Sequence, residues 1–161
     1  MRCALVLFAI FGLLGCERRS SDFTEAELTE IKAENPGMTS ACIRSLRRDG
    51  MPGWLLEIDK CFRMMPAKRW HGVWRIGFEW SNFCPSPARD CPIFGEPGVI
   101  TLERAEGAYS GPPLQDGLYA IDFIGRRTEK RGAHGHLNQY EHAIVVDRVN
   151  SLNEIGGGRN R

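Results

Sequence analysis

Large apolar residues, with Gly72 as the one exception, occupy every second position from Trp70 to Trp80, and this alternation constrains the fold more than any other feature of the chain. His71, Arg75 and Glu79 occupy the opposite parity. Because successive side chains of a strand point to opposite faces, the pattern predicts one long strand with a core face. The apolar residues on the core parity are Trp70, Trp74, Ile76, Phe78 and Trp80.

Three later segments also have the composition of strands, at residues 99–103, 117–128 and 140–152. A Gly-Pro-Pro sequence separates the first two, and a glycine-containing loop at 132–139 precedes the third. Such spacing is typical of an antiparallel meander or a small barrel. Gly125 interrupts the second segment, which indicates a β-bulge or a sharp bend there.

The region before the strands is predicted to be helical. Asp22 or Thr24 is suited to cap a first helix that ends near Asn35, and a second short helix is expected over 40–48. The apolar run 54–58 is ambiguous between helix and strand, because periodicity cannot assign so short a segment.

These elements predict an α+β fold. One or two N-terminal helices are expected to pack on a curved antiparallel sheet of four to six strands. The number and spacing of the strands also permit closure into a small barrel like that of the oligosaccharide/oligonucleotide-binding (OB) fold.

The N-terminus predicts export. Arg2 supplies a positive charge, and the apolar stretch 4–14 that follows is too short to span a bilayer as a mature helix. It ends in Leu13-Leu14-Gly15-Cys16, which resembles the lipobox of bacterial lipoproteins. The resemblance implies that Cys16 accepts a diacylglyceryl group and becomes the first residue after cleavage.

The predicted organisation is a lipoprotein signal peptide at 1–15, a tether at 16–21, one globular domain at 22–152 and a disordered tail at 153–161. Two or three acyl chains hold a protein at a membrane effectively permanently. Glu17 rather than Asp follows the cysteine, so the resemblance favours the periplasmic face of the outer membrane over the inner membrane. An ordinary secretory peptide with an incidental Cys16 is the alternative.

The overall charge gives no support to a nucleic-acid partner. Removal of residues 1–15 takes away Arg2 and leaves 20 basic and 20 acidic residues, so no overall field favours nucleic acid. Acidic residues are concentrated at 22–34 and basic residues at 126–131, and a solvated surface is the simplest interpretation of both clusters.

The remaining cysteines are predicted to form two disulfides. Once Cys3 has left with the signal peptide and Cys16 is acylated, four cysteines remain in an oxidising compartment. Two of them flank a short proline-containing loop, so we pair these with each other, although four cysteines allow three pairings. The predicted bridges are Cys84 with Cys91 and Cys42 with Cys61.

A second resemblance covers residues 60–152, which look like small uncharacterised lipoproteins of proteobacteria. Such proteins carry no established activity to transfer. The residues that carry the resemblance are Trp70, Gly72, Trp74, Gly77–Glu79, Ser81, Phe83, Pro85, Leu118–Ala120, Asp122, Phe123, Gly125–Arg127, Gly135–Leu137 and Ile144–Arg148.

The densest group of chemically active side chains follows the expected bend at Gly125. Arg126, Arg127, His134 and His136 are the candidate binding residues, with Glu79 as an anchor for the arginines. An arginine there is suited to hold an anionic group of the envelope, such as a phosphate or a carboxylate. Alternatively, Arg126 is structural and pairs with Glu79 or Asp147.

A metal site is the alternative for the histidines. His134 and His136 lie on one loop, and His142 or His71 would complete a set of three ligands. Exposed histidines on a hairpin loop are common without metal, so we expect neither metal nor cofactor.

An extracytoplasmic hydrolase is the functional alternative. The chain has no Gly-x-Ser-x-Gly motif, but Glu79, Asp122 and Asp147 would provide acid and base groups if they converged on one face. We therefore predict a lipid-anchored envelope protein with a non-catalytic binding or structural role, whose partners are the membrane, an envelope protein or an anionic envelope component.

Overall fold

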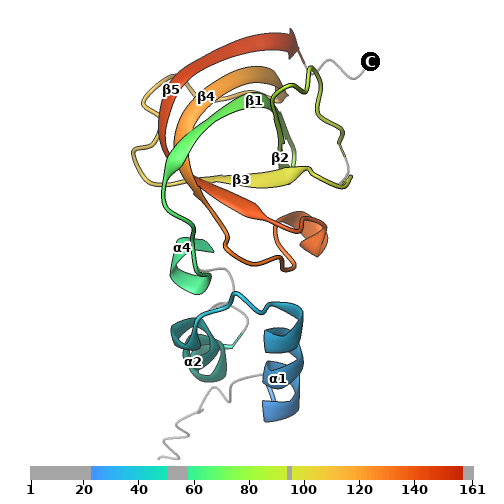
Figure 1. Cartoon of the computed structure of the whole chain (residues 1–161), viewed down its shortest axis with the longest axis vertical. Helices are drawn as coiled ribbons and strands as arrows, with labels where there is room; N and C mark the ends of the chain where they lie inside the picture. Colours follow the sequence, from blue (N-terminus) through green and yellow to red (C-terminus); the bar gives the residue numbers. More distant parts are fainter. Residues whose placement is uncertain (1–22, 51–57, 94–95, 158–161) are drawn as a thin grey trace, which may run out of the picture.

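The computed structural model describes residues 23–50, 58–93 and 96–157. It has an α+β fold in which short helices lie at one end of a closed five-stranded barrel (Figure 1). Among the described residues, no helix has the length and apolar content needed to cross a bilayer. The predicted signal peptide, the tether and Cys16 lie outside the described residues, as does Trp54.

The two predicted N-terminal helices are present. Helix α1 spans Glu25–Glu34, and the hydroxyl of Thr24 caps it by accepting a hydrogen bond from the backbone N–H of Glu27. Helix α2 spans Ser40–Asp49 and ends at Gly50. A third short helix, α4 (Ile58–Cys61), was not predicted because its segment is too short to show a period.

The helices pack against one another and against the outside of the barrel. Leu28 of α1 and Leu46 of α2 are buried in one cluster with Ala143 and Val145 of the last strand. The bridge between Cys42 and Cys61 joins α2 to α4, as predicted. The helical layer therefore covers one patch of the barrel wall.

Strands β1 (Lys68–Gly77) and β2 (Trp80–Pro85) form a hairpin where the alternation predicted one long strand. Gly77 pairs with Trp80, so Phe78 and Glu79 form the turn. The prediction of a single strand is therefore wrong. The turn could not be recognised in the sequence because neither of its residues is a typical turn former. Glu79 nevertheless adopts a positive φ of 66° in this turn.

The other strands are β3 (Ile100–Arg104), β4 (Gly117–Arg127) and β5 (Ala143–Gly157). Their order around the barrel is β1-β2-β3-β5-β4. The β3–β5 pairing is parallel, which corrects the prediction of a wholly antiparallel sheet. Strand β5 continues to Gly157, so residues 153–157 pair with β4 and do not belong to a disordered tail.

The barrel interior contains the main core. Phe83 and Phe123 meet edge to face with their ring centroids 5.2 Å apart, and the inward residues of β3 and β5 pack around them. The predicted irregularity at Gly125 is confirmed, because the β4–β5 register shifts between Ile124 and Gly125. A Cβ atom at Gly125 would lie 2.7 Å from the carbonyl oxygen of Val145, so glycine allows the strands to approach.

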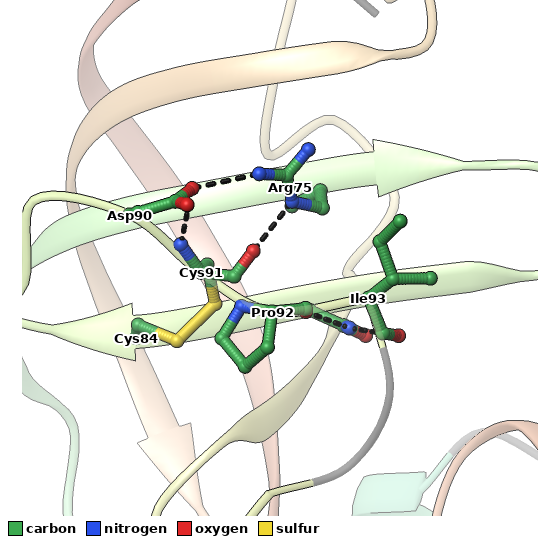
Figure 2. Close-up of polar contacts among 7 residues, drawn as sticks. Arg75, Cys84, Asp90, Cys91, Pro92 and Ile93 are labelled. Carbon is green, nitrogen blue, oxygen red and sulfur yellow. Dashed lines mark hydrogen bonds and ion pairs between the residues drawn. A yellow bond between two sulfur atoms is a disulfide. The ribbon is translucent and has the colours of Figure 1, made fainter. Parts of the chain in front are cut away.

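The second predicted bridge, Cys84–Cys91, closes the loop after β2. Figure 2 shows Arg75 of β1 holding this loop: its guanidinium binds the carboxylate of Asp90 at 2.7 Å and the carbonyl oxygen of Cys91. The side-chain amide of Asn82 donates to the carbonyl oxygens of residues 92 and 93, each at 2.7 Å. The loop is thereby fixed against the outside of β1 and β2.

Candidate functional site

A pocket of about 670 Å³ lies on the outside of the barrel, because its β3 residues alternate with the inward core residues of that strand. Its walls come from the β1–β2 turn with the start of β2, from β3, and from the loop that joins β4 to β5, residues 128–142. Ile58 and Phe62, in and just after α4, complete it. We refer to this cavity as the loop pocket.

The β1–β2 turn supplies one wall. Phe78 is 76% exposed, while the neighbouring Glu79 and Trp80 both line the loop pocket. The indole ring of Trp80 covers Gly77 so closely that a Cβ there would lie 2.4 Å from ring atoms. Glycine at position 77 thus allows Trp80 to lie across the end of the hairpin.

The β4–β5 loop supplies the opposite wall, and three contacts hold it in place. The backbones of His134 and Tyr140 exchange two hydrogen bonds, of 3.0 and 3.2 Å. The hydroxyl of Tyr140 donates to the side-chain oxygen of Asn82 on β2. The buried Asn35 side chain, just beyond α1, accepts from the N–H of Ala133 at 2.9 Å. The barrel and the helical layer both position this loop.

Among the candidate binding residues that line the loop pocket, His134 is the most deeply buried. Its side chain is 3% exposed, and its ring meets Phe62 edge to face with centroids 4.5 Å apart. Burial, reinforced by the nearby His142, lowers the pKa of His134 to about 4. The imidazole is therefore neutral near pH 7.

Two polar atoms of the loop pocket are buried and have no hydrogen-bond partner among the residues that the structure describes. They are Nε2 of His134 and Nε1 of Trp80. A buried polar atom that lacks a partner costs free energy, and such atoms are rare in folded proteins. The pair therefore marks the loop pocket as a place where a bound molecule could supply the absent partners.

Glu79 and His136 connect the two walls. The Nε2 atom of His136 lies 3.8 Å from a carboxylate oxygen of Glu79. Glu103 of β3 is the second carboxylate of the lining, and no lysine or arginine is among the described lining residues. The charge of the lining thus disfavours an anionic ligand.

The structure brings together three of the five candidate binding residues and separates the other two. Glu79, His134 and His136 line the loop pocket, whereas Arg126 and Arg127 do not. The prediction that Glu79 anchors the arginines is wrong, because Glu79 contacts His136 of the β4–β5 loop instead.

Arg126 instead occupies the structural position given as its alternative. Its guanidinium lies 2.7 Å from a carboxylate oxygen of Asp147 on β5 and 2.9 Å from one of Asp59 on α4. These contacts raise the pKa of Arg126 further above its usual range. Arg127 is half-buried near His142. Burial lowers the pKa of His142, and the positive charge of Arg127 lowers it further.

The three carboxylates considered for a hydrolase, Glu79, Asp122 and Asp147, lie in different places. Asp122 is bound by Arg69 and Asn150 on the outside of the barrel, and Asp147 is bound by Arg126. Neither aspartate is part of the loop pocket that contains Glu79. The convergence that the hydrolase alternative requires is therefore not found, because each of the three carboxylates is held by a different set of neighbours.

The histidines are also distributed over separate places. His142 contacts the hydroxyl of Thr128 at 3.0 Å, and His71 lines a different hollow. Within the part of the chain that the structure describes, no three metal-binding side chains gather.

Sequence reasoning missed Trp80, Thr101 and Glu103 as lining residues of the loop pocket. It assigned Trp80 to the core face of a continuous strand. A turn at residues 78 and 79 would have moved Trp80 to the start of a second strand, but the residues carry no turn signal. Comparisons with family models, curated proteins and solved structures give no match.

Proposed function

We propose that this chain is a lipid-anchored envelope lipoprotein whose barrel binds a ligand in the loop pocket without catalysing a reaction. The observation that carries the proposal is the pair of unpartnered buried atoms, His134 Nε2 and Trp80 Nε1, in one pocket. Since both atoms are shielded from water, a ligand has to shift these side chains slightly to reach them, and the hydrogen bonds it supplies offset that cost.

The topology supports a ligand site at the loop pocket. The strand order β1-β2-β3-β5-β4 and the parallel β3–β5 pair are compatible with an OB-type barrel. In such barrels the β1–β2 and β4–β5 loops and the adjoining strand face bind oligosaccharides or oligonucleotides. The loop pocket is lined by these same two loops and by β3.

Export and lipidation are proposed from the N-terminal sequence. The apolar stretch followed by Leu13-Leu14-Gly15-Cys16 is the supporting feature, and the two disulfides are consistent with an oxidising compartment. With Glu17 after the cysteine, the outer membrane is the favoured location. We expect Cys16→Ala to move the protein out of the membrane fraction as an uncleaved precursor; unchanged membrane association would contradict lipidation.

A binding role has more support than hydrolysis. The pocket serine, Ser81, accepts a hydrogen bond from the indole N–H of Trp74 at 2.9 Å, and neither pocket histidine contacts it. Nucleophilic catalysis requires a hydroxyl beside a base, and His134 gains a proton only near pH 4.

Native mass spectrometry of the full-length chain extracted from membranes in mild detergent tests the ligand site. We expect a bound small molecule on the wild-type protein and its loss in Ala133→Trp, which fills the loop pocket. Ala120→Trp, which adds the same bulk in a separate hollow, should retain it. Identical spectra for all three proteins would overturn the proposal.

A further inference from the structure

Two exposed apolar side chains that the proposed function has not used adjoin lining residues of the loop pocket in the sequence. Phe78 is 76% exposed and Leu137 is 72% exposed. Phe78 precedes Glu79 on one wall, and Leu137 follows His136 on the other. His136 and Glu79 lie 3.8 Å apart, so the backbone brings Phe78 and Leu137 to the same side of the loop pocket, and we call these two residues the rim.

The backbone holds this rim in a costly conformation. Glu79, Leu137 and Asn138 adopt positive φ values of 66°, 53° and 57°. Positive φ values are unfavourable in free energy for residues other than glycine, and such strain is concentrated at functional sites. Exposure of large apolar groups on strained turns suggests contact with a ligand rather than a role in folding.

The lining of the loop pocket combines apolar side chains, such as Ile58 and Phe62, with polar groups that include both donors and acceptors. The carboxylates of Glu79 and Glu103 accept hydrogen bonds, the indole of Trp80 donates one, and the hydroxyl of Ser81 can do either. A matching ligand therefore has apolar faces and many groups that both donate and accept hydrogen bonds.

We propose that the loop pocket takes an uncharged saccharide, with Phe78 and Leu137 packed on the C–H faces of its sugar rings. The hydroxyl groups donate to the pocket carboxylates and accept from the indole of Trp80. This inference rests on the proposed function and specifies its ligand. It replaces the anionic ligand expected from the sequence, since neither arginine lines the loop pocket.

A membrane surface is the other class of contact that exposed apolar tips would serve. The polar groups of the lining favour the saccharide, because insertion of Phe78 and Leu137 into a bilayer would leave these groups without a ligand partner. Binding to vesicles is therefore a separate outcome of the test.

The experiment uses the full-length chain in detergent micelles on an array of immobilised saccharides. The array carries uncharged glucose and N-acetylglucosamine oligomers, the corresponding amino sugars, and sulfated sugars. We expect binding to one or more uncharged oligomers and a loss of at least about tenfold in affinity for the Phe78→Ser, Leu137→Ser double variant. Ile155→Ser, a 51% exposed residue that lines a different hollow, is the matched control and should bind normally.

Three results would overturn the saccharide proposal: binding restricted to sulfated or amino sugars, no binding to any sugar, or an unchanged affinity in the double variant. Rim-dependent binding to phosphatidylglycerol vesicles in place of sugars would also overturn it. If the native protein still carries a small molecule that Ala133→Trp loses, only the saccharide class fails. If no small molecule is found, the proposed function fails as well.

Discussion

Acidification from about pH 8 to about pH 5 is expected to destabilise this protein through His134. Burial in the folded state lowers the pKa of His134 to about 4, whereas the pKa of a histidine in an unfolded chain is about 6.5. The unfolded state therefore takes up the proton first. The stabilising contribution is complete above about pH 6.5 and is lost as the pH falls toward 4.

The size of the effect follows from this difference in pKa. At about pH 5 the unfolded histidine is almost fully protonated and the folded one is mostly neutral, so the loss relative to pH 8 is roughly 2 kcal/mol. The difference would approach about 3 kcal/mol if the pH fell to 4. His142 also has a lowered pKa and adds to the total, so the share of His134 has to be isolated.

Urea unfolding of the wild-type chain and of His134→Gln at several pH values between 8 and 5 measures this share. Glutamine removes the titration, and the difference between the two free energies of unfolding should shrink by roughly 2 kcal/mol over this range. A constant difference between the two proteins would refute the reasoning. It would mean that His134 is accessible to protons in the folded state or that its neighbours adjust to its charge.

Four further variants test the packing described above. Arg126→Ala should lower the free energy of unfolding by about 2 kcal/mol, because it leaves two carboxylates without their guanidinium partner. Arg127→Ala should lower it by about 0.5 kcal/mol or less. Equal losses in the two variants would contradict the structural role of Arg126. The Cys84→Ser, Cys91→Ser pair should cost about 2–3 kcal/mol in chemical denaturation, and an unchanged midpoint would show that the loop is held without the bridge. Gly125→Ala places a Cβ 2.7 Å from a carbonyl oxygen of β5, so we expect a loss of about 1–3 kcal/mol in the same assay; a more stable variant would show that the strands can separate freely there.

Short-range chemistry in the sequence predicted much of the fold. The capping threonine at position 24, the apolar side of α2 and the glycine at position 125 each act on their immediate neighbours, and each appears in the structure as expected. The two disulfides were also predicted correctly, because a short loop between Cys84 and Cys91 makes that pairing the simplest one.

The errors arise where distant segments decide the outcome. Alternation continues through Phe78 and Glu79, so the hairpin turn between β1 and β2 is invisible to a rule based on period. The direction of β5 beside β3 depends on the path of the intervening chain and on no local signal. Arg126 was grouped with the loop histidines by sequence distance, but its partners are Asp59 and Asp147, the first of them far away in the chain.

The candidate site was predicted only in part, because some of its residues are neighbours in the sequence and others are brought together by the fold. His134 and His136 share a loop, and their grouping follows from proximity in sequence. Glu79 was included as a partner for arginine, and its place beside His136 results from barrel closure. The lining residues on β3 could not have been found, because nothing in their sequence distinguishes them from other strand residues.

The barrel is closed by the last strand to be made. Strand β5 pairs with β4 along most of its length and with β3, which begins at residue 100. A long loop must therefore close, with a loss of chain entropy, before the β3–β5 contacts can form. This makes folding slow relative to a helical domain of this size. Until the C-terminal residues arrive, β3 and β4 present open edges that can pair with other chains, so aggregation competes with folding during this interval.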